Sequence, residues 1–212
     1  LPNWFRQPLP DELSLRQSRW LKKAEQETVC SRAKCPNLNN CFANRQMTFM
    51  ILGGQCTRNC AFCAVPKANG ANLEVDFNEP QRISRLVKDF GLKYVVITSV
   101  TRDDLADGGA GEFVRTIEQV RQVSPDVLVE VLIPDFGANE DSIQKVAVSR
   151  AAVVAHNLET VKRLSSRLRP QADYQRSLNV LKLVKQFNCS AITKSSLMLG
   201  LGETEDEVVE VL

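Results

Sequence analysis

Short apolar runs alternate with amphipathic segments along most of this chain. Five runs rich in apolar and β-branched residues predict strands over residues 49–52, 94–98, 127–133, 151–155 and 190–199. Between them, apolar residues recur at helical spacing, and Pro80 and Gly91 mark the two ends of the first such segment. This pattern predicts helices over residues 80–90, 111–123, 140–148, 158–166, 174–187 and 203–212, and an N-terminal amphipathic helix over residues 11–27.

The repetition of strand and helix predicts an α/β fold with a parallel sheet and helices outside it. Periodicity alone does not separate an open, doubly wound sheet from a barrel. With 212 residues, 43% of them hydrophobic, the chain has enough apolar residues for one globular domain with a sizeable core. A net charge of +2 gives no reason to expect nucleic acid or a membrane surface as a partner, and no apolar run is long enough to span a bilayer.

Three cysteines follow the first predicted strand at C-x3-C-x2-C spacing: Cys56, Cys60 and Cys63. Thiolates this close can converge from one loop, and three of them can hold three irons of a four-iron–four-sulfur cluster. The fourth iron then has no cysteine from the loop and is open to a substrate or cofactor. A zinc site or buried free thiols are the alternatives, but zinc sites usually pair two C-x-x-C units or add histidine, and His156 is the only histidine.

A second cysteine triplet precedes the first at C-x4-C-x5-C spacing: Cys30, Cys35 and Cys41. Disulfides are the alternative, but they are typical of small secreted domains with weak cores, and this chain has ample apolar residues. Two iron–sulfur clusters account better for six of the seven cysteines. Cys189 lies in an apolar segment and is predicted to be a small buried hydrophobic residue. Unpaired thiols indicate a reducing compartment, so we expect the cytoplasm, with an organelle as the alternative.

The octapeptide from Cys56 to Cys63 resembles the signature of the radical S-adenosylmethionine superfamily, including the aromatic Phe62 before the last cysteine. The two triplets in this order resemble the lipoyl synthase family. Further similar segments extend along nearly the whole chain: residues 34–42, 98–105, 107–109, 130–136, 156–160, 169–170, 172–178, 193–194 and 197–204. A departure from the family pattern is Ser196, where the family has glycine.

The resemblance implies a partial parallel (β/α) barrel over residues 47–212, preceded by an extension, residues 1–46, that carries an auxiliary cluster. In such barrels the loops at the carboxyl ends of the strands build the site. The triplet of Cys56 lies at such an end, as do the segments 98–99, 134–135 and 156–157 and Met198. We therefore expect one common pocket.

The superfamily pattern implies contacts to S-adenosylmethionine from several of these positions. Thr98 and Ser99 are expected to meet its amino group, and Asn157 and Glu159 its ribose hydroxyls and methionine part. For Asn157 a helix cap is an equal alternative. Near the adenine we expect Met198. Lys194 and Arg169 are expected to face the same cavity as the substrate, where either cation could orient a carboxylate or a carbonyl. For His156 we expect a structural role, with its hydrogen bonds satisfied. The charged loop over residues 102–107 is expected to line the substrate channel or to be solvated.

The function implied by the resemblance is insertion of two sulfur atoms, at C6 and C8, into an octanoyl chain on a lysine of a lipoyl carrier protein. The carrier would be a lipoyl domain or a protein of the glycine cleavage H type. The cluster at Cys56, Cys60 and Cys63 would donate an electron to S-adenosylmethionine, and the resulting 5′-deoxyadenosyl radical would remove hydrogen. The auxiliary cluster at Cys30, Cys35 and Cys41 would supply the sulfur. A reductase with flavodoxin, or ferredoxin, would be the electron donor.

The family pattern continues beyond Leu212 with a further strand and a tail that supplies a serine ligand to the auxiliary cluster. This sequence therefore leaves two other functions open. One is a shortened, non-catalytic protein with two iron–sulfur clusters, and the other is a different radical S-adenosylmethionine enzyme with an auxiliary cluster. A structural zinc protein is a third alternative, which predicts zinc and no iron.

Overall fold

The computed structural model describes residues 37–70 and 73–212 and six separate positions before them, Glu12, Leu15, Arg19, Thr28, Val29 and Cys35. Most of the predicted N-terminal helix over residues 11–27 lies outside the described residues, and so does Cys30. No helix in the described part of the chain is long and apolar enough to cross a membrane.

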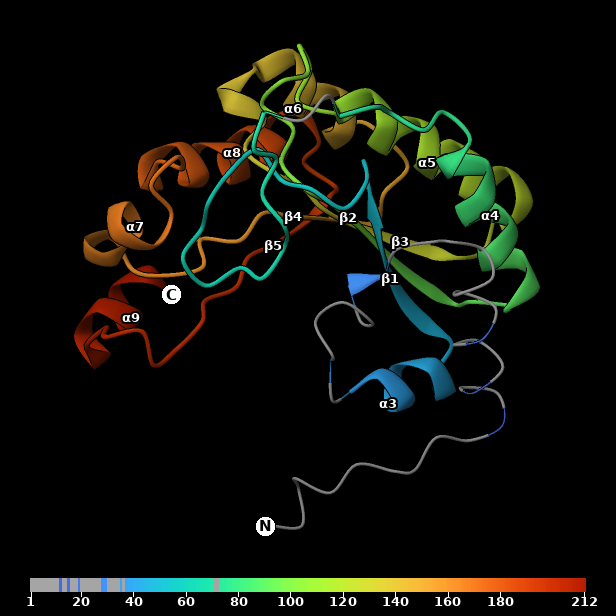
Figure 1. Cartoon of the computed structure of the whole chain (residues 1–212), viewed down its shortest axis with the longest axis horizontal. Helices are drawn as coiled ribbons and strands as arrows, with labels where there is room; N and C mark the ends of the chain where they lie inside the picture. Colours follow the sequence, from blue (N-terminus) through green and yellow to red (C-terminus); the bar gives the residue numbers. More distant parts are fainter. Residues whose placement is uncertain are drawn as a thin grey trace.

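Five parallel strands form one sheet in sequential order, β1-β2-β3-β4-β5 (Figure 1). Their bounds are β1 Gln46–Ile51, β2 Tyr94–Ser99, β3 Leu128–Leu132, β4 Val153–Ala155 and β5 Ile192–Lys194. A doubly wound sheet reverses its strand order partway, because its helices cover both faces. Sequential order instead means that each crossover continues in the same direction around the sheet. Among the described strands β1 and β5 remain unpaired with each other, so the fold is an open, partial barrel, as predicted.

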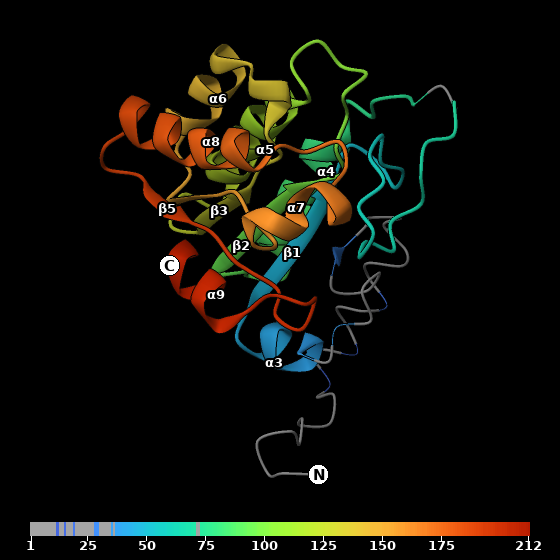
Figure 2. The same cartoon turned by 90° about the vertical axis from the view of Figure 1, so that its left-hand side faces the viewer.

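The helices between the strands form an arc over one face of the sheet (Figures 1 and 2). Along this arc α4 contacts α5, α5 contacts α6, and α6 contacts α8. Their bounds are α4 Glu79–Asp89, α5 Ala110–Val123, α6 Glu140–Ala147 and α8 Tyr174–Phe187. The shorter elements are α3 Leu38–Ala43, the 3-10 helix η2 Phe136–Ala138, α7 Lys162–Leu168 and α9 Glu205–Val211.

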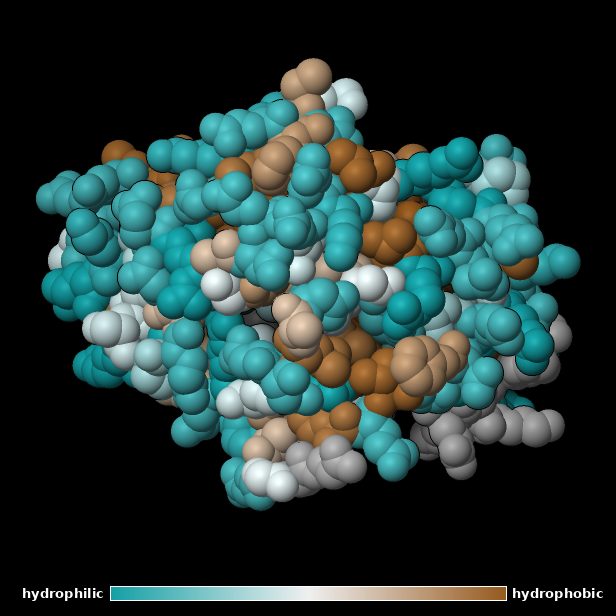
Figure 3. Space-filling model, turned by 90° about the horizontal axis from the view of Figure 1, so that it is seen from above, coloured by the Kyte–Doolittle hydropathy of each residue, from teal (hydrophilic) through white to brown (hydrophobic). Residues whose placement is uncertain are grey.

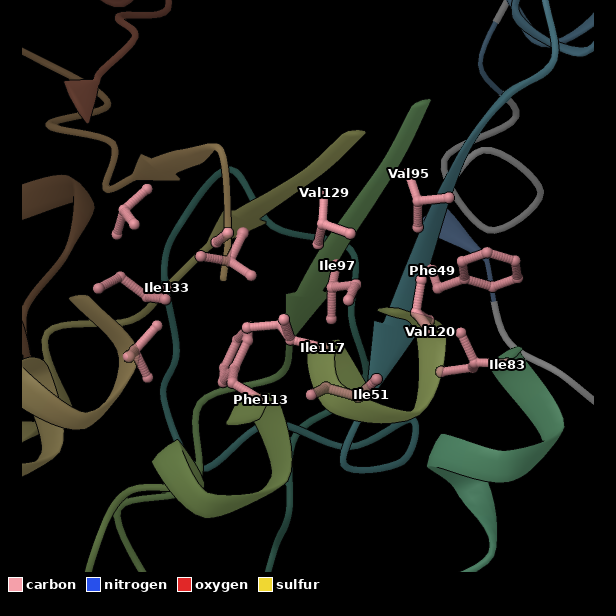
Figure 4. Packing of buried hydrophobic residues seen from close by; sticks show 14 of the residues in the cluster. Phe49, Ile51, Ile83, Val95, Ile97, Phe113, Ile117, Val120, Val129 and Ile133 are labelled. Atoms are coloured by element: carbon pink, nitrogen blue, oxygen red, sulfur yellow. The ribbon is translucent and has the colours of Figure 1, made fainter. Parts of the chain in front are cut away.

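The hydrophobic core lies between this arc and the sheet. Alternate strand residues such as Phe49, Ile97 and Val129 are fully buried and lie toward the helices (Figure 4). From α5, Phe113 and Ile117 meet them. The ring of Phe113 also packs edge-on against Phe136 of η2, with 6.0 Å between centroids. This packing fixes the strands beneath the loops that leave their carboxyl ends.

The other face of the sheet is more polar. Thr48, Val96 and Glu130 are paired across β1, β2 and β3 in one row, and all three line a pocket of about 330 Å³. Glu130 accepts a hydrogen bond from Lys194 Nζ at 2.7 Å and another from the Tyr94 hydroxyl. Because burial and this carboxylate disfavour the phenolate, the pKa of Tyr94 is raised above its ordinary value. This face is the concave side of the partial barrel.

Three predictions were wrong in detail. The strand predicted over residues 190–199 is paired only from Ile192 to Lys194. The helix predicted from residue 158 begins at Lys162, because Glu159 has a left-handed backbone (φ 65°) that a right-handed helix cannot accommodate. Cys189 is exposed rather than buried, since it follows the end of α8 in the turn before β5.

Candidate functional site

The three cysteines of the C-x3-C-x2-C motif lie on the long loop between β1 and α4. Cys56, Cys60 and Cys63 are each half-buried, and all three line one pocket of about 200 Å³. The loop folds back on itself at Cys56, whose N–H donates to Pro66 O at 2.9 Å and whose carbonyl accepts from Ala68 N at 2.9 Å. These bonds hold the first cysteine beside the segment that follows the third.

Backbone hydrogen bonds anchor this cysteine loop to the strand ends around it. Thr57 N donates to Thr101 O, just beyond β2, at 3.0 Å. On the other side, Ala61 N donates to Leu168 O, the last residue of α7, at 2.8 Å. The loop is thus held at two positions between its cysteines, which places them over the carboxyl end of the sheet.

Arg58, between the first two cysteines, connects the loop to the segments that follow β2 and β3. Its guanidinium donates to both Asp103 oxygens at 2.7 Å and to the two Asp135 oxygens at 2.7 and 3.0 Å. Burial lowers the pKa of Arg58, but the two carboxylates outweigh it and raise the pKa above its ordinary value. Burial also raises the pKa of Asp135, and Arg58 more than offsets this, so that the net shift is downward. Arg58 therefore links the cysteine loop to the loops after β2 and β3.

Arg102 holds the two ends of the same loop. Its side chain is fully buried and donates to Leu73 O at 2.7 Å, with a longer contact of 3.5 Å to Leu52 O. Asp104 accepts from the same guanidinium at 2.7 and 2.8 Å. The expectation that the charged loop lines a substrate channel or is solvated is therefore wrong for Arg102, which has a structural position under the cysteine loop.

The electrostatic environment of the three thiols favours binding to positively charged iron. Burial raises the pKa of the Cys60 thiol, Arg169 lowers it, and repulsion from Cys56 and Cys63 raises it again. Thiolates that repel one another are stabilised when each binds an iron. No three His, Cys, Asp or Glu side chains in the described ranges are grouped as ligands of a single metal ion would be. A four-iron cluster does not need such a group, because each thiolate binds a different iron.

Four of the residues predicted to bind S-adenosylmethionine line the same pocket: Thr98, Ser99, Asn157 and Glu159. Thr98 Oγ1 donates to Leu132 O at 3.1 Å, whereas the buried Ser99 hydroxyl has no partner among the described residues. Burial raises the pKa of Glu159, and the hydrogen bond from Asn157 Nδ2, at 3.1 Å, partly offsets it. Asn157 therefore orients a carboxylate in the pocket and does not cap a helix; the N-cap of α7 is Val161.

Two of the predicted residues lie elsewhere. Lys194 is paired with Glu130 and lines the pocket on the concave face, not the cysteine pocket. Met198 also does not line the cysteine pocket, but its N–H donates to Glu159 O at 2.9 Å. Arg169 lies where it was expected: it lines the pocket and is almost fully buried, with Nη1 donating to Leu158 O at 3.0 Å.

Of the second cysteine triplet, Cys35 and Cys41 are described and Cys30 lies outside the described residues. Cys35 and Cys41 are both half-buried. Cys41 is on α3 and lines the pocket on the concave face together with Glu130 and Lys194. The structure therefore brings one cysteine of the second triplet to the open side of the barrel.

Sequence reasoning missed two features of the site. Arg58 and Asp135 are brought together across 77 positions of the chain, and no local pattern signals their contact. His156 was expected to be satisfied, but only its Nδ1 is, at 2.8 Å from Ile133 O; its buried Nε2 has no partner among the described residues. Seen from above, hydrophobic residues gather near the centre of one face within a mostly hydrophilic surround (Figure 3).

The sequential βα sheet with three cysteines after its first strand defines a class of protein. Residues 50–212 match the family model described as the Radical SAM superfamily, and the chain belongs to this superfamily. Membership of this superfamily implies a four-iron–four-sulfur cluster and S-adenosylmethionine as cofactors. The crystal structure of HydG, a maturase of the [FeFe]-hydrogenase, has the same fold: its TM-score is 0.62 at 15% identity, over 94% of this chain and 49% of that one.

Curated relatives of high sequence identity show to which family within the superfamily the chain belongs. A lipoyl synthase of Caldanaerobacter subterraneus subsp. tengcongensis is 50% identical over 211 residues, which span 100% of this chain and 73% of that protein. A lipoyl synthase of Caldicellulosiruptor saccharolyticus is 50% identical over 212 residues, 100% of this chain and 74% of that protein. Within the superfamily, the chain belongs to the lipoyl synthase family.

Proposed function

We propose that this chain inserts two sulfur atoms, at C6 and C8, into an octanoyl chain held on a lysine of a lipoyl carrier protein. Its relatives named lipoyl synthase match it from end to end and support this reaction. The observation that carries the proposal is the pocket in which the three thiols of one loop meet the polar ends of β2, β3 and β4.

Cys56, Cys60 and Cys63 would hold the four-iron cluster and leave one iron for S-adenosylmethionine. When bound, this cluster supplies the electron that cleaves S-adenosylmethionine, and so provides the radical that removes hydrogen from unactivated carbon. The protein's own task is to position the reactants and exclude water. Arg58 serves this task, since its bonds to Asp103 and Asp135 fix the loop before any cofactor binds.

The residues around the thiols have matching roles in this proposal. The free Ser99 hydroxyl can accept a hydrogen bond from the amino group of S-adenosylmethionine, and Thr98 lies beside it. The Glu159 carboxylate, oriented by Asn157, can accept from the ribose hydroxyls. Met198 does not line this pocket, but its N–H donates to Glu159 O and would help to hold Glu159 in place.

The sulfur source would be a second four-iron cluster at Cys30, Cys35 and Cys41. Cys41 lies on α3, which ends at Ala43, and β1 begins at Gln46, so the proposed boundary between residues 1–46 and the barrel at 47–212 falls one residue into β1. Since Cys41 lines the concave pocket, Lys194 and Glu130 would lie near this cluster, not near S-adenosylmethionine. The pair could orient the carbonyl of the octanoyl chain there.

The substrate class is a lipoyl carrier protein, and a reductant is required. A lipoyl domain or a glycine cleavage H type protein would be the carrier, and flavodoxin with its reductase, or ferredoxin, the electron donor. We propose neither nucleic acid nor a membrane as a partner, in keeping with a net charge of +2. A protein that holds iron–sulfur clusters on cysteine thiolates suits the reducing conditions of the cytoplasm.

Cysteine variants of the anaerobically reconstituted protein test both cluster assignments. We expect Cys60→Ala to abolish cleavage of S-adenosylmethionine. Cys35→Ala should retain that cleavage but form no lipoyl product, because the sulfur source is lost. Cys189→Ala is the matched control, since this exposed thiol belongs to neither triplet, and it should retain both activities. Lipoyl product from the Cys35→Ala protein would show that the second triplet is not the sulfur source.

The second candidate function is a two-cluster iron–sulfur protein without catalysis, in electron transfer or regulation. The two cysteine triplets alone would suit it. It predicts that iron and sulfide bind while S-adenosylmethionine neither perturbs the cluster spectrum nor is cleaved. Cleavage of S-adenosylmethionine without product on an octanoylated carrier would instead indicate another radical enzyme with an auxiliary cluster.

A further inference from the structure

His156 follows β4 and is 3% exposed in the wall of the cysteine pocket. Its Nδ1 lies 2.8 Å from Ile133 O. A carbonyl oxygen only accepts, so the proton of the neutral ring must be on Nδ1. Nε2 then has a free lone pair, and it has no hydrogen-bond partner among the described residues. Polar atoms this deeply buried nearly always have a partner, so this acceptor, on a residue that lines a binding pocket, is suited to a donor from a bound molecule.

The surroundings keep this nitrogen an acceptor. Burial lowers the pKa of His156, Arg169 and Arg58 lower it further, and the bond to Ile133 O and the Asp135 charge oppose them only in part. The net shift is downward, so the ring is neutral. A neutral ring held by Ile133 O leaves Nε2 with only a lone pair, and His156 lines the pocket. The ligand atom that meets it must therefore be a donor, an N–H or an O–H.

We propose that His156 Nε2 accepts a hydrogen bond from an N–H or O–H group of S-adenosylmethionine, and that His156 is a binding residue of this pocket. This role rests on the proposed function, which places S-adenosylmethionine between the three thiols and the ends of β2 and β4. Its amino group, its ribose hydroxyls and its adenine amine are the donors available. His156 would act beside Ser99 and Glu159, which line the same pocket.

Two substitutions separate this role from a structural one. In His156→Asn, the amide nitrogen can replace Nδ1 and donate to Ile133 O, but nothing replaces Nε2. In His156→Gln, the longer side chain can place an acceptor near the position of Nε2 but cannot keep the bond to Ile133 O. We expect His156→Asn to bind S-adenosylmethionine about tenfold more weakly with a nearly unchanged melting temperature. His156→Gln should bind within about threefold of the unsubstituted protein.

The measurement is a titration of S-adenosylmethionine into the anaerobically reconstituted protein, followed through the cluster spectrum and by calorimetry, without turnover. If the unsubstituted protein binds S-adenosylmethionine and His156→Asn binds it equally well, the role of His156 is overturned. The same holds if His156→Gln is the weaker binder, since this result means that only the bond to Ile133 O matters. If the unsubstituted protein itself does not bind S-adenosylmethionine, the proposed function fails first.

Fragments identify the donor. Methionine and 5′-deoxyadenosine are titrated separately into the unsubstituted protein and His156→Asn. Weaker binding of methionine by the variant would assign the contact to the amino group. Weaker binding of 5′-deoxyadenosine would assign it to the nucleoside. Equal binding of both fragments by both proteins would overturn the contact.

Discussion

Replacing Asp135 by asparagine is expected to loosen the cysteine loop without changing the size of the side chain. Asp135 is fully buried just beyond β3, and its two oxygens accept from Arg58 at 2.7 and 3.0 Å. Gly137 N donates to the same carboxylate at 3.1 Å, and Arg176 lies at 3.4 Å. Asparagine keeps one acceptor oxygen and removes the charge. Arg58, itself 6% exposed, then keeps Asp103 as a carboxylate partner and loses Asp135.

The expected cost follows from the burial of both partners. Removing one member of a buried ion pair typically costs about 3–5 kcal/mol, because the remaining charge is left uncompensated. Asp103 still pairs with Arg58, so we expect the lower end, about 3 kcal/mol. In a domain of this size each kcal/mol lowers the melting temperature by about 2–4 °C. Asp135→Asn should therefore melt roughly 6–12 °C below the unsubstituted protein.

Asp103→Asn is the matched control. It is the same substitution against the same guanidinium, but the Asp103 side chain is 42% exposed, so water can replace the lost interaction. Exposed ion pairs contribute about 0–1 kcal/mol, and the melting temperature should fall by no more than about 4 °C. Both proteins are melted after anaerobic reconstitution, with circular dichroism as the signal. Their iron content and capacity to bind S-adenosylmethionine are measured alongside.

The interaction is isolated by combining Asp135→Asn with Arg58→Met. If the two residues stabilise the loop through each other, the double variant is less destabilised than the sum of the single variants, by about 1–3 kcal/mol. Additive effects would show that Asp135 acts through Gly137 and η2 rather than through Arg58. Equal losses in Asp135→Asn and Asp103→Asn would refute the reasoning from burial.

Two further predictions concern the backbone. Gly109 has φ 92°, and a Cβ there would collide with Leu52 Cδ1, so Gly109→Ala should lower the free energy of unfolding by about 3 kcal/mol. Gly53 has φ 87° and no atom near the position of a Cβ, so Gly53→Ala should lower it by only about 1 kcal/mol. Similar losses for the two variants in denaturant unfolding would exclude the collision. Asn139 caps α6 by accepting from Ser142 N at 3.0 Å, so Asn139→Ala should cost about 1 kcal/mol, and an unchanged unfolding midpoint would show that the cap contributes nothing.

Local patterns in the sequence were enough to predict most of the strands and helices. β1 to β4 fall within three residues of their predicted ends, because a buried parallel strand is a continuous apolar run. β5 was predicted too long, since the apolar residues up to Leu199 also suit the irregular segment that supports the pocket. There Ser195 Oγ accepts from Leu158 N at 3.2 Å. Periodicity did not predict the order of the strands, since it reports burial and not neighbours; the resemblance to the superfamily did, because it implies a partial barrel.

For the site, the sequence could predict only those features whose residues lie within a few positions of one another in the chain. The spacing of Cys56, Cys60 and Cys63 is a local property, and the structure places all three in one pocket. The displacement of Lys194 to the concave face depends on Glu130, 64 positions earlier in the chain. The free nitrogen of His156 depends likewise on which carbonyl its ring meets. Such contacts are decided by the fold and leave no periodic signal.

The cysteine loop illustrates how a segment with little regular structure can be rigid. Between Ile51 and Glu79 it has neither helix nor strand among the described residues, yet both its interior and its ends are bonded to the sheet. Arg58 reaches from the interior of the loop to the ends of β2 and β3, and Arg102 reaches from beyond β2 to both ends of the loop. Both cations are buried, so movement of the loop would separate Arg58 from the Asp135 carboxylate and Arg102 from the carbonyls of Leu52 and Leu73. The conformational entropy of the three thiols is therefore lost when the protein folds, so less entropy is lost when the cofactors bind.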